Sequence, residues 1–256
     1  MTANYHTHTP RCHHAAGTEK EYIENAIQAG FRILGFADHS PQFFEGGYVS
    51  AMRMLPSQAP EYVETIKRLA EEYRNELQIL VGFEAEYFPA LFPRLKQLCR
   101  DCGVDHLILG QHFLHNEQSG VYVGVEGCDQ EKLTAYVDEV IEGIETGCFT
   151  YVAHPDVCRY DADDAFYRRE MGRLCRAAKA ADVPLEINML GHAGKRHYPC
   201  DKFFRIAKET GNSFVIGCDA HTPDFLLDRK AIEGVEKFAA DLGITPLETV
   251  TIKSIV

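Results

Sequence analysis

The sequence of 256 residues lacks several features that mark special classes of protein. It has no apolar run of the roughly 18 residues that a membrane-spanning helix needs, and no apolar signal-peptide core follows Met1. Low-complexity tracts are missing, as is any linker rich in glycine, proline or serine. Hydrophobic residues make up 45% of the chain, enough to bury a sizeable core. We therefore expect a globular protein with a single domain over residues 1–256 and no membrane partner.

Clustered positive charge is also missing. The formal net charge is −12, and no group of lysines or arginines interrupts the negative surface. Such a surface repels the phosphate backbone of a nucleic acid, so small molecules are the expected partners. Any anionic substrate must then be held by local positive charge, such as metal ions, a few arginines or helix N-termini.

Cysteine is present without a disulfide framework. Nine cysteines, an odd number, are scattered along the chain, which favours reduced thiols and a cytoplasmic location. Cys99 and Cys102 form one CxxC pair, but a zinc ribbon needs a second pair, and none follows at a suitable distance. We interpret these two cysteines as ordinary residues near the end of a helix.

Short apolar runs alternate with longer amphipathic ones about seven times. This alternation predicts an α/β fold in which helices surround a parallel sheet. Thr18, followed by an acidic first turn, predicts the start of one helix, and Gly30 predicts its end. Residues 40–56, with their glycines, prolines and aromatic side chains, predict a loop over a site. Strands are expected at 3–8, 32–39, 77–86, 104–113, 149–155, 184–189 and 213–221, and helices near 18–30, 57–76, 90–102, 130–146, 163–181, 200–210 and 225–242.

Side chains that can bind metal ions interrupt most of the expected strands at their C-terminal ends. In a (β/α) barrel these ends converge on one mouth, so residues far apart in sequence become neighbours. The strand at 184–189 ends instead in Asn188, which is assigned to the wall of the site. The candidate ligands from the other six strands are His6, His8, His39, Glu84, His112, His154, Asp219 and His221.

The spacing of these residues strengthens the interpretation as a metal site. A lone histidine after a strand is more often a hydrogen-bonded wall residue than a ligand. His6 and His8, two positions apart, point to the same side of an extended strand. Asp219 and His221 repeat that spacing, and the carboxylate of Glu84 can bridge two cations. Mixed imidazole and carboxylate ligands suit zinc, iron or manganese better than calcium or magnesium.

Six further histidines lie outside this set, and spacing alone does not say whether one of them joins the cluster. We interpret His106, two residues into an expected strand, and His115, past a strand end, as structural. The six are His13, His14, His106, His115, His192 and His197.

A series of ordered motifs extends from His6 to His221: HTHTPRCHH, ADHSP, GFEAEYF, GQHF, AHP, EINMLG and GCDAH. In this order they resemble the PHP (polymerase and histidinol phosphatase) superfamily, and specifically its histidinol-phosphate phosphatase branch. The resemblance implies a distorted (β/α)7 TIM-like barrel with a metal site at the C-terminal ends of the strands. It also implies that His14, six residues after His8, is a ligand and that His13 is only its neighbour.

The resemblance further implies how the ligands divide among ions. Three divalent transition-metal ions are expected, drawn from zinc, manganese and iron. Glu84, Asp219 and His221 are also assigned to catalysis. The first ion is assigned to His6, His8, Glu84 and Asp219, the second to Glu84, His112 and His154, and the third to His14, His39 and His221.

Residues that contact the substrate are less sharply defined. Arg159 and Arg196 follow strand ends, and a guanidinium can bind phosphate bidentately, although both also fit solvated loops. The resemblance favours a substrate role, because members of the superfamily commonly place a basic phosphate contact in these loops. Lys195 competes with Arg196 for it, and Ser40, directly after His39, is a third candidate for substrate binding.

Two acidic residues and one wall segment complete the expected site. Asp38 and Asp156 adjoin expected ligands and could orient imidazoles, although Asp156 suits helix capping equally well. Residues 188–191 read NMLG where members of the superfamily often read NTAG or NTSG. This wall of the site is therefore expected to be bulkier and more apolar.

Together these features predict a metal-dependent phosphatase for a small phosphorylated metabolite, with L-histidinol phosphate, from histidine biosynthesis, as the preferred substrate. Metal ions would create a positive pocket in a negative protein, acidify a shared water and neutralise phosphoryl charge. The alternatives are another small phosphate ester, a 3'–5' exonuclease, which the net charge disfavours, and a non-catalytic metal-binding module.

Overall fold

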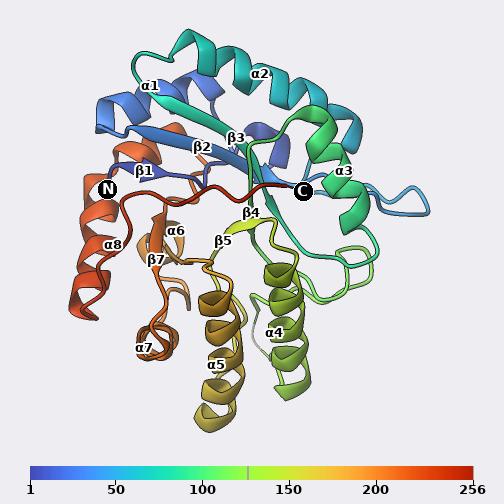
Figure 1. Cartoon of the computed structure of the whole chain (residues 1–256), viewed down its shortest axis with the longest axis vertical. Coiled ribbons are helices and arrows are strands. Elements are labelled where there is room, and N and C mark those ends of the chain that lie inside the picture. Colours follow the sequence, from blue (N-terminus) through green and yellow to red (C-terminus); the bar gives the residue numbers. More distant parts are fainter. Residues whose placement is uncertain (126, 256) are drawn as a thin grey trace.

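A single parallel sheet organises the protein, and the helices lie around it (Figure 1). The computed structural model describes residues 1–125 and 127–255. The strands follow one another in the sheet in chain order, each paired in parallel with the next. They are β1 (Ala3–Asn4), β2 (Ile33–His39), β3 (Gln78–Ala85), β4 (His106–Leu109), β5 (Phe149–Val152), β6 (Leu185–Asn188) and β7 (Phe214–Gly217).

The two end strands, β1 and β7, meet just beyond their last residues. Thr7 pairs with Ala220 in a parallel bridge. The backbone N of His8 donates to the carbonyl of Ala220 at 2.9 Å, and the N of Ala220 donates to the carbonyl of His6 at 3.2 Å. The sheet therefore closes on itself, and the expected distorted (β/α)7 TIM-like barrel is confirmed.

The helices connect successive strands, as the alternation in the sequence predicts. Thr18 caps the first helix through a capping box with Glu21, and Gly30 ends it with a φ of 89°, so both expected boundaries are confirmed. The α-helices are α1 (Glu19–Ala29), α2 (Ala59–Glu72), α3 (Phe92–Cys102), α4 (Gln130–Glu145), α5 (Asp164–Ala180), α6 (Met189–Ala193), α7 (Asp201–Thr210) and α8 (Arg229–Asp241); the 3-10 helices are η1 (Pro10–Cys12), η2 (Pro56–Gln58) and η3 (Pro223–Leu227).

Some element boundaries differ from the sequence-based prediction. The first strand ends at Asn4, because beyond it only the bridge at Thr7 continues the pairing. The helix expected near 225–242 is divided into η3 and α8, and the side chain of Asp228 caps α8 by accepting from the N of Ala231 at 3.0 Å. The short helix α6 was not predicted; Asn188 caps it by accepting from the N of Gly191 at 2.7 Å.

Two apolar clusters hold the barrel together. The larger one fills the space between the sheet and the surrounding helices. The smaller one includes Tyr5, Ile108 and Tyr151, and Val250 and Ile252 from the C-terminal segment pack against it. The C-terminal segment crosses the N-terminal ends of the strands, since the N of Leu247 donates to the first residue of β7. The C-terminal ends of the strands are left for polar residues.

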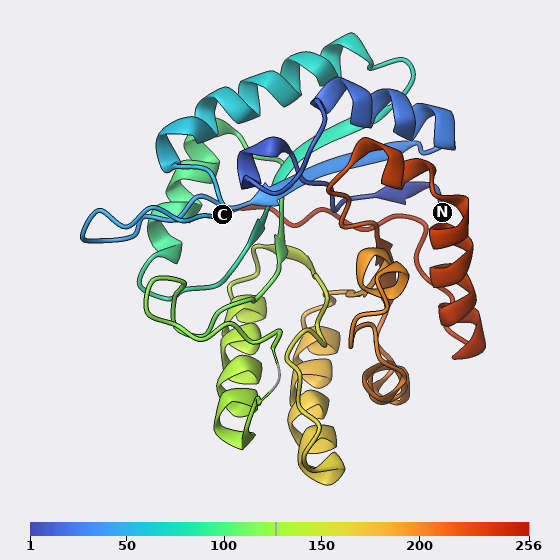
Figure 2. The same cartoon turned by 180° about the vertical axis from the view of Figure 1, so that it is seen from behind.

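Residues 40–56 form a long irregular segment between β2 and α2, with a tip that extends away from the barrel (Figure 2). Part of the segment returns to the barrel, where Met52 reaches the main cavity and Arg53 is buried. Within the described ranges, none of the helices combines the length and the hydropathy that crossing a bilayer requires.

Candidate metal centre

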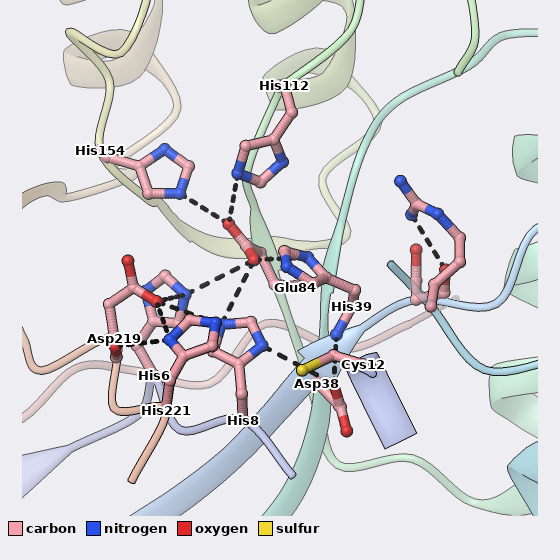
Figure 3. Close-up of polar contacts among 12 residues, drawn as sticks. His6, His8, Cys12, Asp38, His39, Glu84, His112, His154, Asp219 and His221 are labelled. Atoms are coloured by element: carbon pink, nitrogen blue, oxygen red, sulfur yellow. Dashed lines mark hydrogen bonds and ion pairs between the residues drawn. The ribbon is translucent and has the colours of Figure 1, made fainter. Parts of the chain in front are cut away.

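A cavity of about 390 Å³ lies at the C-terminal ends of the barrel strands. Imidazoles and carboxylates form one part of its lining, and Figure 3 shows how these groups face one another. Apolar and aromatic side chains and one arginine form the rest. The lining residues are His14, His39, Met52, Glu84, His112, Tyr122, His154, Leu190, Arg196, Tyr198, Asp219 and His221.

Four donor atoms surround one point beneath this cavity. The Nε2 atom of His6 lies 3.6 Å from Oε2 of Glu84 and 3.5 Å from Oδ1 of Asp219. The Nε2 atom of His8 lies 3.6 Å and 3.2 Å from the same two oxygens. Donors about 2.0–2.1 Å from a tetrahedral ion lie roughly 3.3 Å from one another, so the observed spacings suit one such ion.

The second oxygen of Glu84 faces a different pair of imidazoles. Its Oε1 atom lies 2.7 Å from Nε2 of His154 and 3.5 Å from Nε2 of His112. Glu84 thus presents one oxygen to each of two groups of donors, which is the arrangement that a bridging carboxylate requires. Gly110 makes this placement compatible with the chain, because a Cβ at position 110 would collide with the Glu84 side chain.

Three imidazoles form a third group at the rim. The donor atoms of His14, His39 and His221 lie within 4.8 Å of one another. Nδ1 of His39 is also 2.9 Å from Oε2 of Glu84, so this group adjoins the first one. The structure therefore brings all nine sequence-predicted ligands into one cluster: His6, His8, His14, His39, Glu84, His112, His154, Asp219 and His221.

Several buried donor atoms of this cluster have no hydrogen-bond partner in the described part of the chain. They include Nε2 of His6, Nε2 of His8 and Oε2 of Glu84. A buried polar atom left without a partner costs about 1–3 kcal/mol. A cation at the point where these atoms meet would remove that cost. Imidazole and carboxylate donors together fit a divalent transition metal.

Charges within the cluster shift one another's pKa values. Burial alone would raise the pKa of Glu84, but the facing imidazoles, His112 first, hold it well below its usual range. Burial lowers the pKa of His6, and the carboxylates of Glu186, Asp219 and Glu84 outweigh it and raise that pKa to about 10. Glu84 is therefore ionised at neutral pH, the form that binds a cation, and a cation must displace a proton from His6.

Two of the expected ligands have unusual backbone conformations. His154 has a φ of 28° and Asp219 a φ of 54°, values that residues other than glycine rarely adopt. Such conformations cost on the order of 1–3 kcal/mol each and persist where surrounding contacts impose them. At His154 the contact is a hydrogen bond from its backbone N to Oε2 of Glu186, 2.9 Å long.

Glu186, in the middle of β6, is a site residue that sequence reasoning missed. It is fully buried, and its Oε1 atom lies 2.8 Å from Nδ1 of His6. Its Oε2 atom accepts from the backbone N of His154 and, at 3.0 Å, from Nδ2 of Asn188. A Cβ at Gly217 would collide with its carboxylate. The available signal was a glutamate between apolar residues in a strand expected to be buried on both faces.

A buried ion-pair network beside the cluster was also missed. Arg53, only 2% exposed, contacts Oε2 of Glu86 through Nη2 at 2.5 Å and Oε2 of Glu117 through Nε at 2.6 Å. Its Nη1 donates to the carbonyl of Ser40 at 3.1 Å. Oε1 of Glu86 lies 3.5 Å from Nδ1 of His112. The network ties the 40–56 segment to an expected ligand.

Cys12 is another residue that the sequence analysis did not single out. Its sulfur lies within 4.8 Å of a ring nitrogen of His8 and of His221, and its side chain is fully buried. Its position inside HTHTPRCHH was the available signal.

The three candidate substrate contacts lie in different places in the structure. Arg196 lines the cavity, and its Nη1 donates to the hydroxyl of Tyr198 at 2.7 Å. Arg159 borders a different, smaller hollow, with its Nε 3.2 Å from Oδ2 of Asp161. Ser40 is fully buried, and its Oγ accepts from Nε2 of Gln42 at 3.3 Å. Among the three, Arg196 is the one placed in the cavity wall; the other two roles stay predictions.

The two aspartates expected near the ligands have different surroundings. Asp38 accepts from the backbone N of Thr9 at 3.2 Å, and its Oδ1 lies 3.6 Å from Nδ1 of His8. Asp156 accepts from the backbone N of Cys200 at 2.7 Å, at the start of α7. Burial raises the pKa of Asp156 to about 6. Asp38 is thus placed beside an imidazole, and Asp156 at a helix N-terminus.

The histidines interpreted as structural lie apart from the cavity lining. His106 is fully buried, with its ring against Gly35 and Gly82 and its Nε2 3.4 Å from the carbonyl of Tyr5. The side chain of His115 is 74% exposed in the loop after β4.

Comparison with known proteins assigns the chain to a family. The sequence model of the PHP domain matches residues 4–190, most of the chain. The chain belongs to the PHP domain family. The family match includes six of the seven strands and seven of the nine candidate ligands, and it ends before β7 supplies Asp219 and His221.

Several proteins that are similar to this chain are named as histidinol phosphatases. A Deinococcus radiodurans protein called "Probable histidinol-phosphatase" is 28% identical over 237 residues, which are 85% of each chain. The Bacillus subtilis histidinol-phosphatase is 30% identical over 120 residues, 44% of this chain and 45% of that protein. Histidinol phosphate phosphatase from Lactococcus lactis, solved with zinc, L-histidinol and phosphate, has the same fold, with a TM-score of 0.76 at 19% identity over 98% of this chain and 97% of that one.

Proposed function

We propose that this protein is a metal-dependent phosphomonoesterase that hydrolyses L-histidinol phosphate to L-histidinol and inorganic phosphate. The observation that carries the proposal is the convergence of nine imidazole and carboxylate side chains on one cavity. The names of the Deinococcus and Bacillus relatives support histidinol phosphate as the substrate. The nine free cysteines support a cytoplasmic location.

We infer three divalent ions, drawn from zinc, manganese and iron. The 3.2–3.6 Å spacings among His6, His8, Glu84 and Asp219 support the first site. The remaining oxygen of Glu84, with its two imidazoles, supports the second. The residues that would hold the second and third ions are Glu84, His112 and His154, and His14, His39 and His221.

When bound, divalent ions supply Lewis acidity, which polarises phosphoryl oxygens and acidifies a coordinated water. Arg196, from its place in the cavity wall, adds a fixed positive charge for the phosphate. Burial raises the pKa of the Tyr198 hydroxyl, so Tyr198 remains a neutral hydrogen-bond donor beside the guanidinium. These two side chains can bind the phosphoryl group from the wall of the cavity that they share with Glu84 and Asp219.

Three ligands are also assigned to catalysis. Glu84 and Asp219 face the donor groups as ionised carboxylates, because the surrounding imidazoles keep both pKa values low against the effect of burial. Burial and the neighbouring His8 lower the pKa of His221 to about 4. Its ring is therefore neutral at pH 7 and can act as a ligand or accept a proton at the cavity rim.

The organic part of the ester has an apolar and aromatic wall to contact. Leu190 occupies the wall that the NMLG segment was expected to make bulkier, and Met52 contributes from the 40–56 segment. The Tyr122 ring lies parallel to that of His112, with centroids 6.5 Å apart, and Tyr122 also lines the cavity. Aromatic faces such as these can bind the cationic alcohol that histidinol provides.

A phosphatase panel tests the proposal. Purified protein, assayed with added zinc, manganese or iron(II), is given L-histidinol phosphate, p-nitrophenyl phosphate and labelled single-stranded DNA. We expect phosphate release that is fastest from histidinol phosphate and is stopped by a chelator. The Glu84→Gln variant, which loses the bridging charge, provides the inactive control.

Each outcome of the panel bears on the proposal. Release from p-nitrophenyl phosphate but not from histidinol phosphate would retain the phosphatase and remove the substrate. Degradation of the DNA alone would replace the proposal with the exonuclease alternative. Equal release by wild-type protein and Glu84→Gln would show that the activity belongs to a contaminant.

A further inference from the structure

Two cysteines far from each other in sequence have their sulfur atoms in contact. Cys128 precedes α4, and Cys158 follows β5 in the segment that leads to α5. Their Sγ atoms lie 3.0 Å apart as free thiols sharing a hydrogen bond. A disulfide has an S–S distance of about 2.0 Å, so a shift of roughly 1 Å separates this pair from a bond.

The two cysteines belong to segments that both contribute to the cavity. Cys158 lies four residues after His154, an expected ligand. The next residue, Arg159, donates from its backbone N to the carbonyl of Val123 at 3.2 Å, and the N of Val123 donates to the carbonyl of His112 at 2.9 Å. The segment after β4, which also supplies Tyr122 to the cavity, is thus already joined to the segment after β5 by hydrogen bonds.

The surroundings of the pair distinguish an attacking thiol from a resolving one. Cys128 is partly exposed at a shallow hollow that Lys132 also borders. It directly precedes Asp129, the N-cap of the 16-residue α4, where a helix N-terminus favours a thiolate. The hydrogen bond with Cys158 and the charge of Lys132 also lower the pKa of the Cys128 thiol. Cys158 is only 1% exposed, so an oxidant reaches Cys128 first.

We propose that Cys128 and Cys158 form a reversible disulfide when the protein meets a low-molecular-weight disulfide such as oxidised glutathione. The Cys128 thiolate attacks one glutathione sulfur, and the first glutathione leaves as a thiolate. The Cys158 sulfur then loses its proton, attacks the Cys128 sulfur of the mixed disulfide and releases the second glutathione as a thiolate. The two protons of the protein thiols end on the two glutathione thiolates, so two protein thiols are oxidised and one glutathione disulfide is reduced.

This bond connects the two cavity segments covalently. It closes a loop between positions 128 and 158, which reduces the conformational entropy of the unfolded chain. The bond requires neither bound metal nor phosphatase activity, so its test is independent of the proposed function.

The test treats the purified full-length chain with oxidised glutathione and then removes the excess. We expect a non-reducing peptide map to contain a Cys128–Cys158 linked peptide and a thiol titration in denaturant to find two of the nine thiols lost. A melting curve should show Tm raised by about 7 °C for a loop of this length. A phosphine reductant should reverse all three changes.

Two variants supply the comparison. Cys128→Ser should keep its remaining thiols through the same treatment, whereas Cys102→Ser, which removes another partly exposed cysteine, should still lose two. Nine thiols retained by the wild-type protein would overturn the proposal. So would glutathione that stays attached to Cys128, or a linked peptide that joins a different pair.

Discussion

The Nδ1 atom of His6 lies 2.8 Å from Oε1 of Glu186, so a carboxylate within β6 orients an imidazole that follows β1. The other oxygen of Glu186 accepts from the backbone N of His154 at 2.9 Å. One fully buried side chain therefore fixes the positions of two expected ligands from different parts of the chain. Partners of this kind orient the imidazole and raise its basicity as a ligand.

The first prediction concerns this carboxylate. Glu186→Gln removes the charge that faces His6 while keeping the size of the side chain, so we expect metal affinity to fall about 10- to 100-fold. Titration with a metal indicator measures the change. Glu170→Gln is the matched control, because Glu170 is also buried but pairs with Arg169 and Arg173 on α5. Equal metal affinities in the two variants would contradict the orienting role of Glu186.

A second prediction separates the two candidate arginines. Arg196→Gln should raise KM for the phosphate ester about tenfold or more, since an ionic hydrogen bond to phosphate contributes about 1.5–3 kcal/mol. Metal content should stay unchanged. Arg159→Gln should change KM little, because Arg159 borders another hollow and contacts Asp161. If Arg159→Gln raises KM as much as Arg196→Gln, Arg159 reaches the substrate after all.

The third prediction is the pH dependence that His106 gives to stability. Burial lowers its folded-state pKa from 6.5 to about 4. The unfolded chain binds this proton below pH 6.5 and the folded chain only below about pH 4, so stability falls as pH drops through that window. The loss amounts to about 3 kcal/mol at the lower end.

His106→Gln tests this assignment in chelator-treated protein. The Gln side chain keeps a donor for the carbonyl of Tyr5 and does not titrate. The Tm of the His106→Gln protein should therefore fall less than the Tm of wild type between pH 7 and pH 4.5. His115→Gln, a change at an exposed histidine, should leave the wild-type slope unaltered. A His106→Gln slope as steep as that of wild type would assign the acid sensitivity to other groups.

The sequence predicts the barrel and the ligands at its mouth because both follow from local patterns. Buried strands are short apolar runs, and ligands such as His39 and Glu84 interrupt those runs at their C-terminal ends. His14 is different: it lies in a loop after η1, and only the resemblance to the PHP superfamily selected it over His13.

The remaining parts of the site depend on partners that no local pattern contains. Glu186 is an isolated polar residue in a strand until the fold brings His6 to it. Arg53 resembles an exposed loop arginine until the chain returns and buries it between Glu86 and Glu117. Pairing energies of buried charges arise from tertiary contacts, so periodicity and spacing do not reveal them.

Metal content and turnover measured on the same preparations test the central claim most directly. Elemental analysis and an assay of phosphate release from L-histidinol phosphate are carried out on purified wild type and on His154→Asn. The substitution removes the imidazole that lies 2.7 Å from Glu84. Bound transition metal and turnover should both be present in wild type, and both should fall about tenfold or more in the variant. Unchanged metal content and unchanged turnover in His154→Asn would contradict the account.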